Sequence, residues 1–254
     1  MDFHHNFKDQ VVLITGAGSG LGLALAFALG QQGAKLVLGD INQIALQKVA
    51  ADLTALDIQV VFNVCDVSQN VDQVALVQLA LDTWERLDIA VNNAGICPPM
   101  KAFHEVSEAD FDLAMDVNTK GVFLGMKHQL KAMLESEFSS VILNVSSVAG
   151  LGAAPKLASY SASKHAVIGL TKTAAVEYAK KNIRINAICP FYTHTPLVTE
   201  SQLADKIEFL NHSTPMKRLA TTDEIVNVML MLCSPQNTYM TGQAIAVDGG
   251  VTAL

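Results

Sequence analysis

Residues that hold metals or disulfides are scarce and scattered in this sequence. Four cysteines occur among 254 residues, at positions 65, 97, 189 and 233, and no two form a C-x-x-C pair. The spacing therefore indicates neither a metal knuckle nor a small disulfide framework, and we expect buried thiols in a reducing compartment. The seven histidines form no H-x-x-x-H or H-E-x-x-H array, so no metal site is predicted and a metal-dependent hydrolase is disfavoured.

Long apolar runs and blocks of positive charge are also missing. The apolar runs are too short, or too often interrupted by glycine, to span a bilayer, and residues 1–6 lack the pattern of a signal peptide. The net charge is -7, and no more than two Lys or Arg residues stand in succession. This charge argues against nucleic acid or an anionic membrane as the main partner. We therefore predict a soluble, cytoplasmic protein.

Short apolar runs alternate with helical stretches over the whole chain. Half of the residues are hydrophobic, and no linker or change in composition divides them, which indicates one domain, residues 1–254. Strands separated by helices predict a parallel sheet with right-handed crossovers. We predict strands at 11–14, 35–40, 58–64, 87–91, 141–145, 183–188 and 243–250, and helices at 23–29, 43–55, 69–84, 108–135, 159–181 and 222–232.

A glycine-rich turn separates the first predicted strand from the first predicted helix. It contains Gly16, Gly20 and Gly22, together with Ser19 and Leu21. Glycines allow backbone N-H groups to approach a phosphate closely, and the N-terminus of a helix favours negative charge. The turn therefore predicts a site for the phosphates of a dinucleotide.

An acidic residue closes the second predicted strand. Asp40 lies eighteen positions beyond Gly22, where a carboxylate can accept both hydroxyls of an adenosine ribose and repel a 2'-phosphate. This position favours NAD(H) over NADP(H), although an ordinary surface acid at the end of a strand would look the same.

Three further polar positions each allow two interpretations. Asp66 follows the third strand and can accept from the adenine amino group or cap the next helix. Residues 92–95, Asn-Asn-Ala-Gly, follow the fourth strand and suit either a backbone packed against a nucleotide or a plain turn. Asn118 lies inside the long predicted helix, where an asparagine usually points outward or bonds locally, so a function depends on its context.

Tyr160 and Lys164 are spaced so that a helix stacks the phenol and the ammonium on one face. Moving a phenol from its ordinary pKa near 10 to neutrality requires about 4 kcal/mol, and a lysine one turn away supplies part of it. Such a pair also arises by chance, so alone it is weak evidence for a catalytic site. The functional interpretation is supported by Ser147, thirteen residues upstream at the end of a predicted strand. Together they predict proton exchange with a substrate hydroxyl.

The segment at about residues 190–218 is predicted to form a lid over the substrate. Prolines at 190 and 196 are expected to break regular structure there, and a polar region follows. Segments near the predicted cleft are mostly apolar, which favours a hydrophobic or ring-bearing ketone, although these residues can equally pack the lid. The candidates are Ile96, Cys97, Pro98, Pro99, Met100, Val148, Leu151, Phe191, Tyr192 and Leu197.

Taken together, these motifs resemble the short-chain dehydrogenase/reductases of the conventional kind. The resemblance implies a single-domain, Rossmann-type, doubly wound parallel sheet of about seven strands with helices on both faces. It also implies a nicotinamide cofactor and a homotetramer. With the preference for NAD(H) from Asp40, we predict hydride transfer between NAD(H) and a small-molecule substrate, a secondary alcohol or ketone. The matching motifs run in family order over essentially the whole chain: Thr15-Gly16-x-x-x-Gly20-x-Gly22, Asn92-Asn93-Ala94-Gly95, Asn118, Ser147, Tyr160-x-x-x-Lys164 and Thr241-Gly242-Gln243-x-x-x-Val247-Asp248-Gly249-Gly250.

The resemblance also implies roles for individual residues. Tyr160 would be the acid/base, and Lys164 would hold the nicotinamide ribose and lower the pKa of Tyr160. Ser147 would orient the substrate oxygen, and Asn118 would anchor a water for proton relay. The cofactor would contact Gly16, Ser19, Gly20, Leu21, Gly22, Asp40, Ile41, Asp66, Val67, Asn93, Ala94, Gly95, Tyr160, Lys164, Pro190, Thr193 and Thr195.

Two residues depart from the family pattern. Phe191 stands where the loop usually has glycine after Pro190, so a bulky ring replaces a permissive backbone position. Glu85 stands where the family often has glycine, at a position far from the predicted chemistry.

Two other functions remain possible from the sequence. Reduction of a 3-oxoacyl thioester would favour a basic rim, for which only scattered residues, Lys101, Lys206, Lys217 and Arg218, are available. A nucleotide sensor could keep the fold without turnover, because a fold does not determine a function.

Overall fold

The computed structural model describes residues 7–200 and 204–253. Residues 1–6, from which we predicted the absence of a signal peptide, residues 201–203 of the predicted lid, and Leu254 lie outside the described residues. The strands are β1 (Val11–Thr15), β2 (Lys35–Asp40), β3 (Val60–Val64), β4 (Ile89–Asn92), β5 (Ser140–Val145), β6 (Ile183–Pro190) and β7 (Ala244–Val247). The α-helices are α1 (Gly20–Gly30), α2 (Gln43–Thr54), α3 (Asn70–Trp84), α4 (Glu108–Ala114), α5 (Gly121–Leu134), α6 (Ala158–Tyr178), α7 (Pro196–Thr199), α8 (Ile207–His212) and α9 (Thr222–Cys233).

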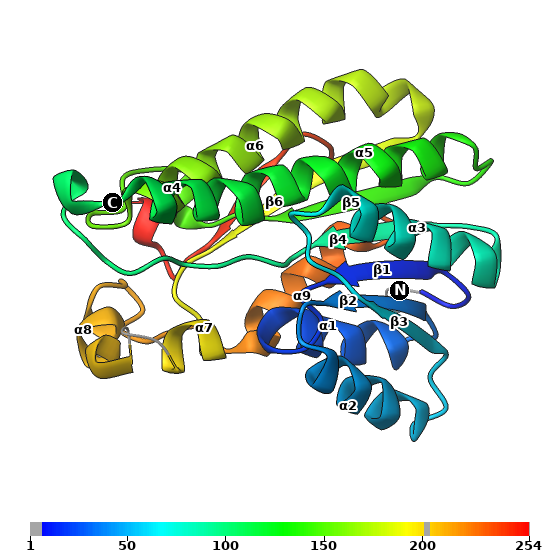
Figure 1. Cartoon of the computed structure of the whole chain (residues 1–254), viewed down its shortest axis with the longest axis horizontal. Coiled ribbons are helices and arrows are strands. Elements are labelled where there is room, and N and C mark those ends of the chain that lie inside the picture. Colours follow the sequence, from blue (N-terminus) through cyan, green and yellow to red (C-terminus); the bar gives the residue numbers. More distant parts are fainter. Residues whose placement is uncertain (1–6, 201–203, 254) are drawn as a thin grey trace.

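The strands form one parallel sheet in the order β3-β2-β1-β4-β5-β6-β7. The strand β1 pairs with β2 on one side and with β4 on the other (Figure 1). The chain therefore winds outward from β1 to β3 in one direction and from β4 to β7 in the other. In such sheets ligands bind at the carboxyl ends of the strands, where the direction of winding reverses. The Rossmann-type sheet predicted from the sequence is therefore confirmed.

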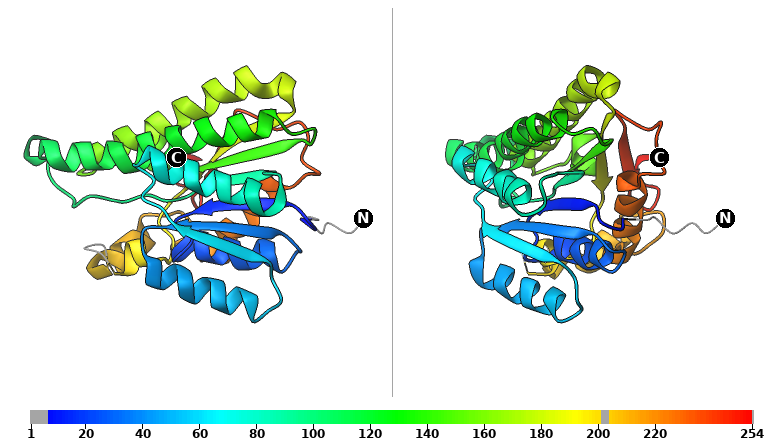
Figure 2. Two further views of the ribbon diagram at one scale, coloured as in Figure 1. Left: turned by 45° about the vertical axis from the view of Figure 1, so that its right-hand side comes forward. Right: turned by 90° about the vertical axis from the view of Figure 1, so that its right-hand side faces the viewer.

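Helices cover both faces of the sheet (Figure 2). One apolar core joins α1, α2 and α9 to Val12 and Ile14 of β1, and a second core joins α3, α5 and α6 to Val11 and Leu13. Consecutive residues of β1 thus enter opposite cores, and all are fully buried. This is why the strand is an unbroken apolar run rather than an alternating one.

The long helix predicted at 108–135 is interrupted. A π-helical segment, Met115–Lys120, separates α4 from α5, and Asn118 lies within it. At its end Gly121 packs so tightly on Val67 that an added Cβ would lie 2.8 Å from a methyl group of that residue. The wider turn rotates Asn118 inward, so its side chain is fully buried rather than pointing outward.

The predicted lid contains helices that the sequence analysis did not anticipate. Pro196 was expected to break regular structure, but it begins the short helix α7, because the fixed φ of proline suits the first position of a helix. The helix α8 follows, and the two lie together at one end of the molecule (Figure 1). Within residues 7–200 and 204–253, no helix is both long enough and apolar enough to cross a bilayer.

Candidate active site

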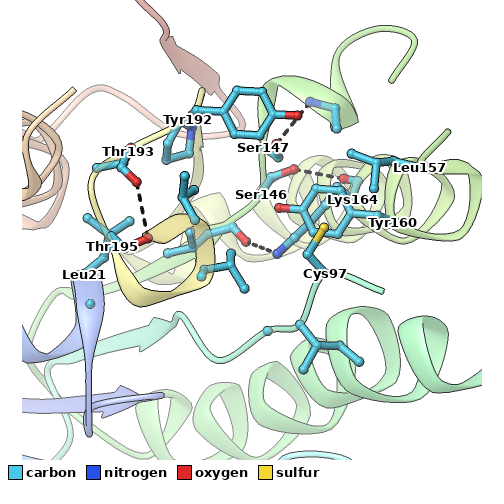
Figure 3. A pocket seen from close by; sticks show the side chains of 18 of the residues that line it. Leu21, Cys97, Ser146, Ser147, Leu157, Tyr160, Lys164, Tyr192, Thr193 and Thr195 are labelled. Carbon is cyan, nitrogen blue, oxygen red and sulfur yellow. Dashed lines mark hydrogen bonds between the residues drawn. The ribbon is translucent and has the colours of Figure 1, made fainter. Parts of the chain in front are cut away.

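A cavity of about 1060 Å³ lies at the carboxyl ends of the strands. It is lined by residues that follow β1 to β4 and by the last residues of β5 and β6. Sites for small molecules usually have about 300 to 1,000 Å³, so this cavity has room for a cofactor and a substrate together. Figure 3 shows Leu21 and Thr195 at one end of it, and Ser147, Tyr160 and Cys97 at the other.

Most of the predicted site residues line this cavity. Every predicted cofactor residue except Gly22 does so, and so does Ser147. Gly22 lies beneath the glycine-rich turn, and Asn118 lies behind the wall. The structure therefore brings together residues from positions 16 to 195 of the sequence.

The glycine-rich turn is tightly built. Gly16 has φ +67°, in the region that favours glycine, and a Cβ there would lie 2.8 Å from the Cα of Ala94. A Cβ on Gly22 would lie 2.2 Å from the carbonyl oxygen of Gly16. Asn93 secures the turn, because its Nδ2 donates to the carbonyl oxygens of Thr15 (2.9 Å) and Gly16 (3.1 Å).

The helix α1 begins at this turn with free N-H groups. Ser19 is its N-cap residue, but its side chain makes no capping hydrogen bond, and the first turn holds no acidic residue. A Cβ on Gly20 would lie 3.5 Å from the Cβ of Thr195, so the loop after β6 closes over the same point. The helix dipole, the N-H groups and the missing Cβ atoms fit the phosphates of a dinucleotide.

Asp40 is held in place at the adjoining part of the cavity. Its Oδ2 accepts from the backbone N-H of Gly18 (2.8 Å), and its Oδ1 accepts from that of Asn42 (2.9 Å). The carboxylate therefore has a fixed orientation at the end of β2, with acceptor capacity left for a ribose.

Asp66 does not cap the following helix directly. Gln69 is the N-cap residue of α3, and Asp66 instead accepts from the backbone N-H and the hydroxyl of Ser68. The helix-cap interpretation was therefore wrong. Asp66 stabilises the turn before the helix and lines the cavity.

Three contacts align the loop after β5 with the start of α6. The hydroxyl of Ser146 donates to the carbonyl oxygen of Lys164 (2.9 Å), and that of Ser161 donates to the carbonyl oxygen of Ala149 (2.8 Å). Between them, a Cβ on Gly150 would lie 2.6 Å from the carbonyl oxygen of Lys164. The loop thereby holds Ser147 beside Tyr160, the third residue of α6.

Lys164 is almost fully buried, and its Nζ donates to the carbonyl oxygen of Val145 (2.9 Å). The same Nζ lies 5.7 Å from the centroid of the Tyr160 ring, so the predicted spacing of the pair is observed. Burial lowers the pKa of Lys164 to about 8.

The pKa of Tyr160 is shifted opposite to our prediction. Burial raises it above the ordinary value, with the nearby Cys97 as the second cause, while a hydrogen bond with Ser147 acts in the lowering direction. Lys164 is not among the causes of this shift, and its ammonium donates to the carbonyl oxygen of Val145. Its lowering effect on the phenol therefore stays a prediction. Tyr160 is therefore a protonated phenol at neutral pH.

Asn118 connects the loop after β4 to α6. Its Oδ1 accepts from the backbone N-H of Ile96 (2.8 Å), and its Nδ2 donates to the carbonyl oxygen of Ile96 (2.9 Å) and to the Ser163 hydroxyl (3.1 Å). Gly95 fits between Asn118 and Lys164, because a Cβ there would lie 3.0 Å from the Asn118 Oδ1 and 3.3 Å from the Lys164 Nζ. The asparagine thus holds together the backbone around the reacting groups, and its role in proton relay stays a prediction.

The substrate end of the cavity differs in part from the predicted set. Pro98, Pro99 and Leu151 do not line it, whereas the other predicted apolar residues do. The sequence analysis missed residues 153–157, because no motif marks a loop that is placed only by folding. Of the four cysteines, three are buried as expected, and Cys97 is half-buried because it lies at this end of the cavity.

Comparisons with known proteins agree with this geometry. The sequence model of a family described as enoyl-(acyl carrier protein) reductase matches residues 16–252. The chain is 38% identical over 249 residues to cyclohexanol dehydrogenase of Acinetobacter sp. (strain SE19). The aligned region covers 98% of this chain and 97% of that protein. The chain belongs to the short-chain dehydrogenase/reductase family.

Solved structures of this family superpose closely on the chain. The crystal structure of levodione reductase matches with a TM-score of 0.93 and 38% identity, covering 97% of this chain and 99% of that one. The 3-ketoacyl-(acyl-carrier-protein) reductase from Brucella melitensis, complexed with NADH, matches with a TM-score of 0.90 and 34% identity, again over 97% and 99%. The protein is an oxidoreductase that transfers hydride between a nicotinamide cofactor and an alcohol or ketone.

Proposed function

We propose that the protein is an NAD(H)-dependent dehydrogenase/reductase for a small, apolar, ring-bearing secondary alcohol or ketone. The observation that carries the cofactor choice is Asp40, whose carboxylate is fixed at the cavity by the backbone of Gly18 and Asn42. A 2'-phosphate would meet this negative charge and that of Asp66. The lysines of the cavity wall, Lys156, Lys164 and Lys206, belong to its other parts.

Tyr160 and Ser147 would carry the proton transfer. Bound NAD supplies the hydride acceptor, the nicotinamide ring. In oxidation, the Tyr160 oxygen takes the proton of the substrate hydroxyl, and in reduction the phenol returns it. The Ser147 hydroxyl, which hydrogen-bonds Tyr160, would hold the substrate oxygen beside that phenol. Lys164 is buried, with its Nζ 5.7 Å from the centroid of the Tyr160 ring. It would bind the ribose hydroxyls and place a positive charge near the developing phenolate.

The apolar lining of the substrate end favours a ring-bearing ketone. Met100, Val148 and Leu157 surround it, together with the rings of Phe191 and Tyr192. The names of two relatives, cyclohexanol dehydrogenase and levodione reductase, support a cyclic substrate.

A thioester on a carrier protein fits less well. Of the basic residues that would form its rim, Lys101 pairs with Asp110, and Arg218 forms a bidentate pair with Glu224. These cations are already neutralised by neighbouring carboxylates, so they offer little attraction to an acidic carrier.

The direct test is the absorbance of reduced nicotinamide during incubation of the protein with cyclic and open-chain secondary alcohols. Each alcohol is offered with NAD and with NADP in parallel. We expect turnover of cyclic alcohols, with a preference for NAD of at least about tenfold in kcat/KM. Equal use of both cofactors would contradict the assignment of Asp40, and turnover of open-chain alcohols alone would contradict the substrate class.

We further propose that the chain forms one domain with the lid at about residues 190–218. The homotetramer and the cytoplasmic location stay predictions from the sequence and from the family. Size-exclusion chromatography with light scattering tests the tetramer, and a monomeric mass would contradict it.

A further inference from the structure

The loop after β6 holds Tyr192 rigidly at the cavity. The N-H of Phe191 donates to the carbonyl oxygen of Val247 (3.1 Å), and the N-H of Ala220 donates to that of Tyr192 (3.3 Å). Two residues beyond Tyr192, the N-H of His194 donates to the carbonyl oxygen of Ala220 (2.9 Å). The backbone of Tyr192 is therefore tied on both sides in a strand-like way, which limits its movement.

Phe191 fits this backbone without strain. Its φ is not among the positive values of the chain, so the position does not require the glycine that is usual in the family. Its ring instead contacts the Tyr192 ring edge to face, with the centroids 4.6 Å apart and an angle of 68° between the planes. The substitution of glycine by phenylalanine thus gives the Tyr192 side chain a packing partner.

The lid fixes the other side of the Tyr192 ring. Tyr192 packs with Met100 against a small apolar cluster, whose buried members are Val198, Leu210 and Leu219. Both the side chain and the backbone of Tyr192 are therefore positioned before any ligand arrives, which reduces the entropy lost on binding.

The Tyr192 hydroxyl is directed toward the reacting end of the cavity. Figure 3 shows it pointing from the loop toward the end that holds Ser147 and Tyr160. Tyr192 and Cys97 both contribute to the raised pKa of Tyr160, so all three lie near one another. Burial raises the pKa of Tyr192 as well, which leaves it a neutral donor at neutral pH.

This hydroxyl makes no hydrogen bond to the part of the chain that the structure describes, whereas other polar groups of the cavity, such as Asp40 and Thr193, do. A substrate whose only oxygen is the reacting one would displace water from the Tyr192 hydroxyl and leave that hydroxyl without a hydrogen bond. Such an unpaired group weakens binding by about 5- to 150-fold. A substrate with an oxygen at this point would avoid that cost.

We propose that Tyr192 is a specificity-determining residue and that the preferred substrate carries a second oxygen, as a hydroxyl or a carbonyl, besides the one that reacts. This inference rests on the proposed function, because it assumes that a ketone or alcohol occupies the space beside Tyr160. It narrows the substrate class to cyclic diols, hydroxyketones and diones.

The test compares Tyr192→Phe with the wild type on matched ketones and NADH. Cyclohexanone offers one oxygen, and cyclohexane-1,4-dione and 2-hydroxycyclohexanone offer two. The phenylalanine keeps the ring contact with Phe191 and removes only the hydroxyl. Tyr239→Phe is the control, because Tyr239 is fully exposed and does not line the cavity.

We expect Tyr192→Phe to lower kcat/KM roughly tenfold for at least one two-oxygen ketone. For cyclohexanone, kcat/KM should stay the same or rise by up to about tenfold, because the variant removes the hydroxyl that this ketone leaves unpaired. An equal effect on all three ketones, or no effect on any, would overturn the inference alone. Weaker NADH binding would overturn it as well, because Tyr192 would then serve the cofactor. No turnover of any ketone by the wild type would contradict the proposed function, and with it this inference.

Discussion

The two ends of the cavity are built in different ways. At the cofactor end, the groups that would meet a nicotinamide cofactor are backbone atoms and short side chains fixed by the sheet, such as the turn at Gly16 and the carboxylate of Asp40. At the substrate end, side chains from three loops meet. Among the residues that the structure describes, the small apolar cluster of the lid has three buried members, Val198, Leu210 and Leu219. The first end tolerates little change, whereas the second can be altered side chain by side chain to suit a new substrate.

The strongest disruption of the cofactor end is expected from Gly22→Ala. The new Cβ would lie 2.2 Å from the carbonyl oxygen of Gly16 and 2.6 Å from the Asn93 Nδ2, so the turn must shift. We expect NADH to bind about 100-fold more weakly in a fluorescence titration, which corresponds to about 2.7 kcal/mol. Gly152→Ala is the control, because no atom lies within 4 Å of its added Cβ. A dissociation constant within threefold of the wild type would show that the turn is looser than the structure indicates.

Asp40→Ala should alter which cofactor the cofactor end prefers, rather than the shape of this part of the cavity. Removing the carboxylate takes away the ribose acceptor and the repulsion of a 2'-phosphate, so the ratio of NADPH to NADH affinity should rise by about 10- to 100-fold. Both dissociation constants are measured by titration, with Asp52→Ala as the control, an aspartate that pairs with Lys48 outside the cavity. An unchanged ratio would make Asp40 a bystander.

The pH dependence of the rate probes the substrate end. Oxidation needs the phenolate of Tyr160, and burial raises the pKa of this phenol. The value of kcat/KM for oxidation should therefore rise with pH across the range 6 to 9, by up to about tenfold per unit, without levelling off near pH 7. Reduction needs the protonated phenol and should vary little between pH 6 and 8. A plateau of the oxidation rate below pH 7 would mean that the phenol has a lowered pKa.

The smallest expected effect lies outside both ends. Glu85 ends α3 in the left-handed conformation with φ 58°, where glycine is favoured. Glu85→Gly should therefore raise the free energy of unfolding by about 1 kcal/mol, measured in urea, and leave kcat unchanged. Glu135→Gly is the matched control, because Glu135 ends α5 in the right-handed region, where glycine should not stabilise. Stabilisation by both changes, or by neither, would contradict this explanation.

Which residues line the cofactor end of the cavity could be predicted from the sequence almost residue by residue. The turn from Gly16 to Gly22 and residues 93–95 each follow a strand, and Asp40 is the last residue of β2. Parallel strands bring their carboxyl ends to one edge of the sheet. Tyr160 and Lys164 could be predicted because a helix fixes their spacing. In all of these cases, a local pattern determines where the side chain lies.

The parts that could not be predicted depend on contacts between distant segments. The π-helical segment around Asn118 depends on the packing of Gly121 against Val67. The position of Leu157 in the cavity wall depends on the loop that joins β5 to α6. The direction of the pKa shift of Tyr160 depends on burial, which the sequence does not state.

The division of the cavity into a cofactor end and a reacting end is best tested by the effect of Tyr160→Phe on two quantities in the same preparation. One is the rate of oxidation of a cyclic alcohol, followed by the absorbance of NADH, and the other is the dissociation constant of NADH. If, as proposed, the phenol exchanges the proton while the glycine-rich turn and Asp40 hold the cofactor, the rate should fall by about 10² to 10⁴ while NADH binding stays within about twofold. A retained rate, or a parallel loss of NADH binding, would contradict the division of the cavity into a cofactor end and a reacting end.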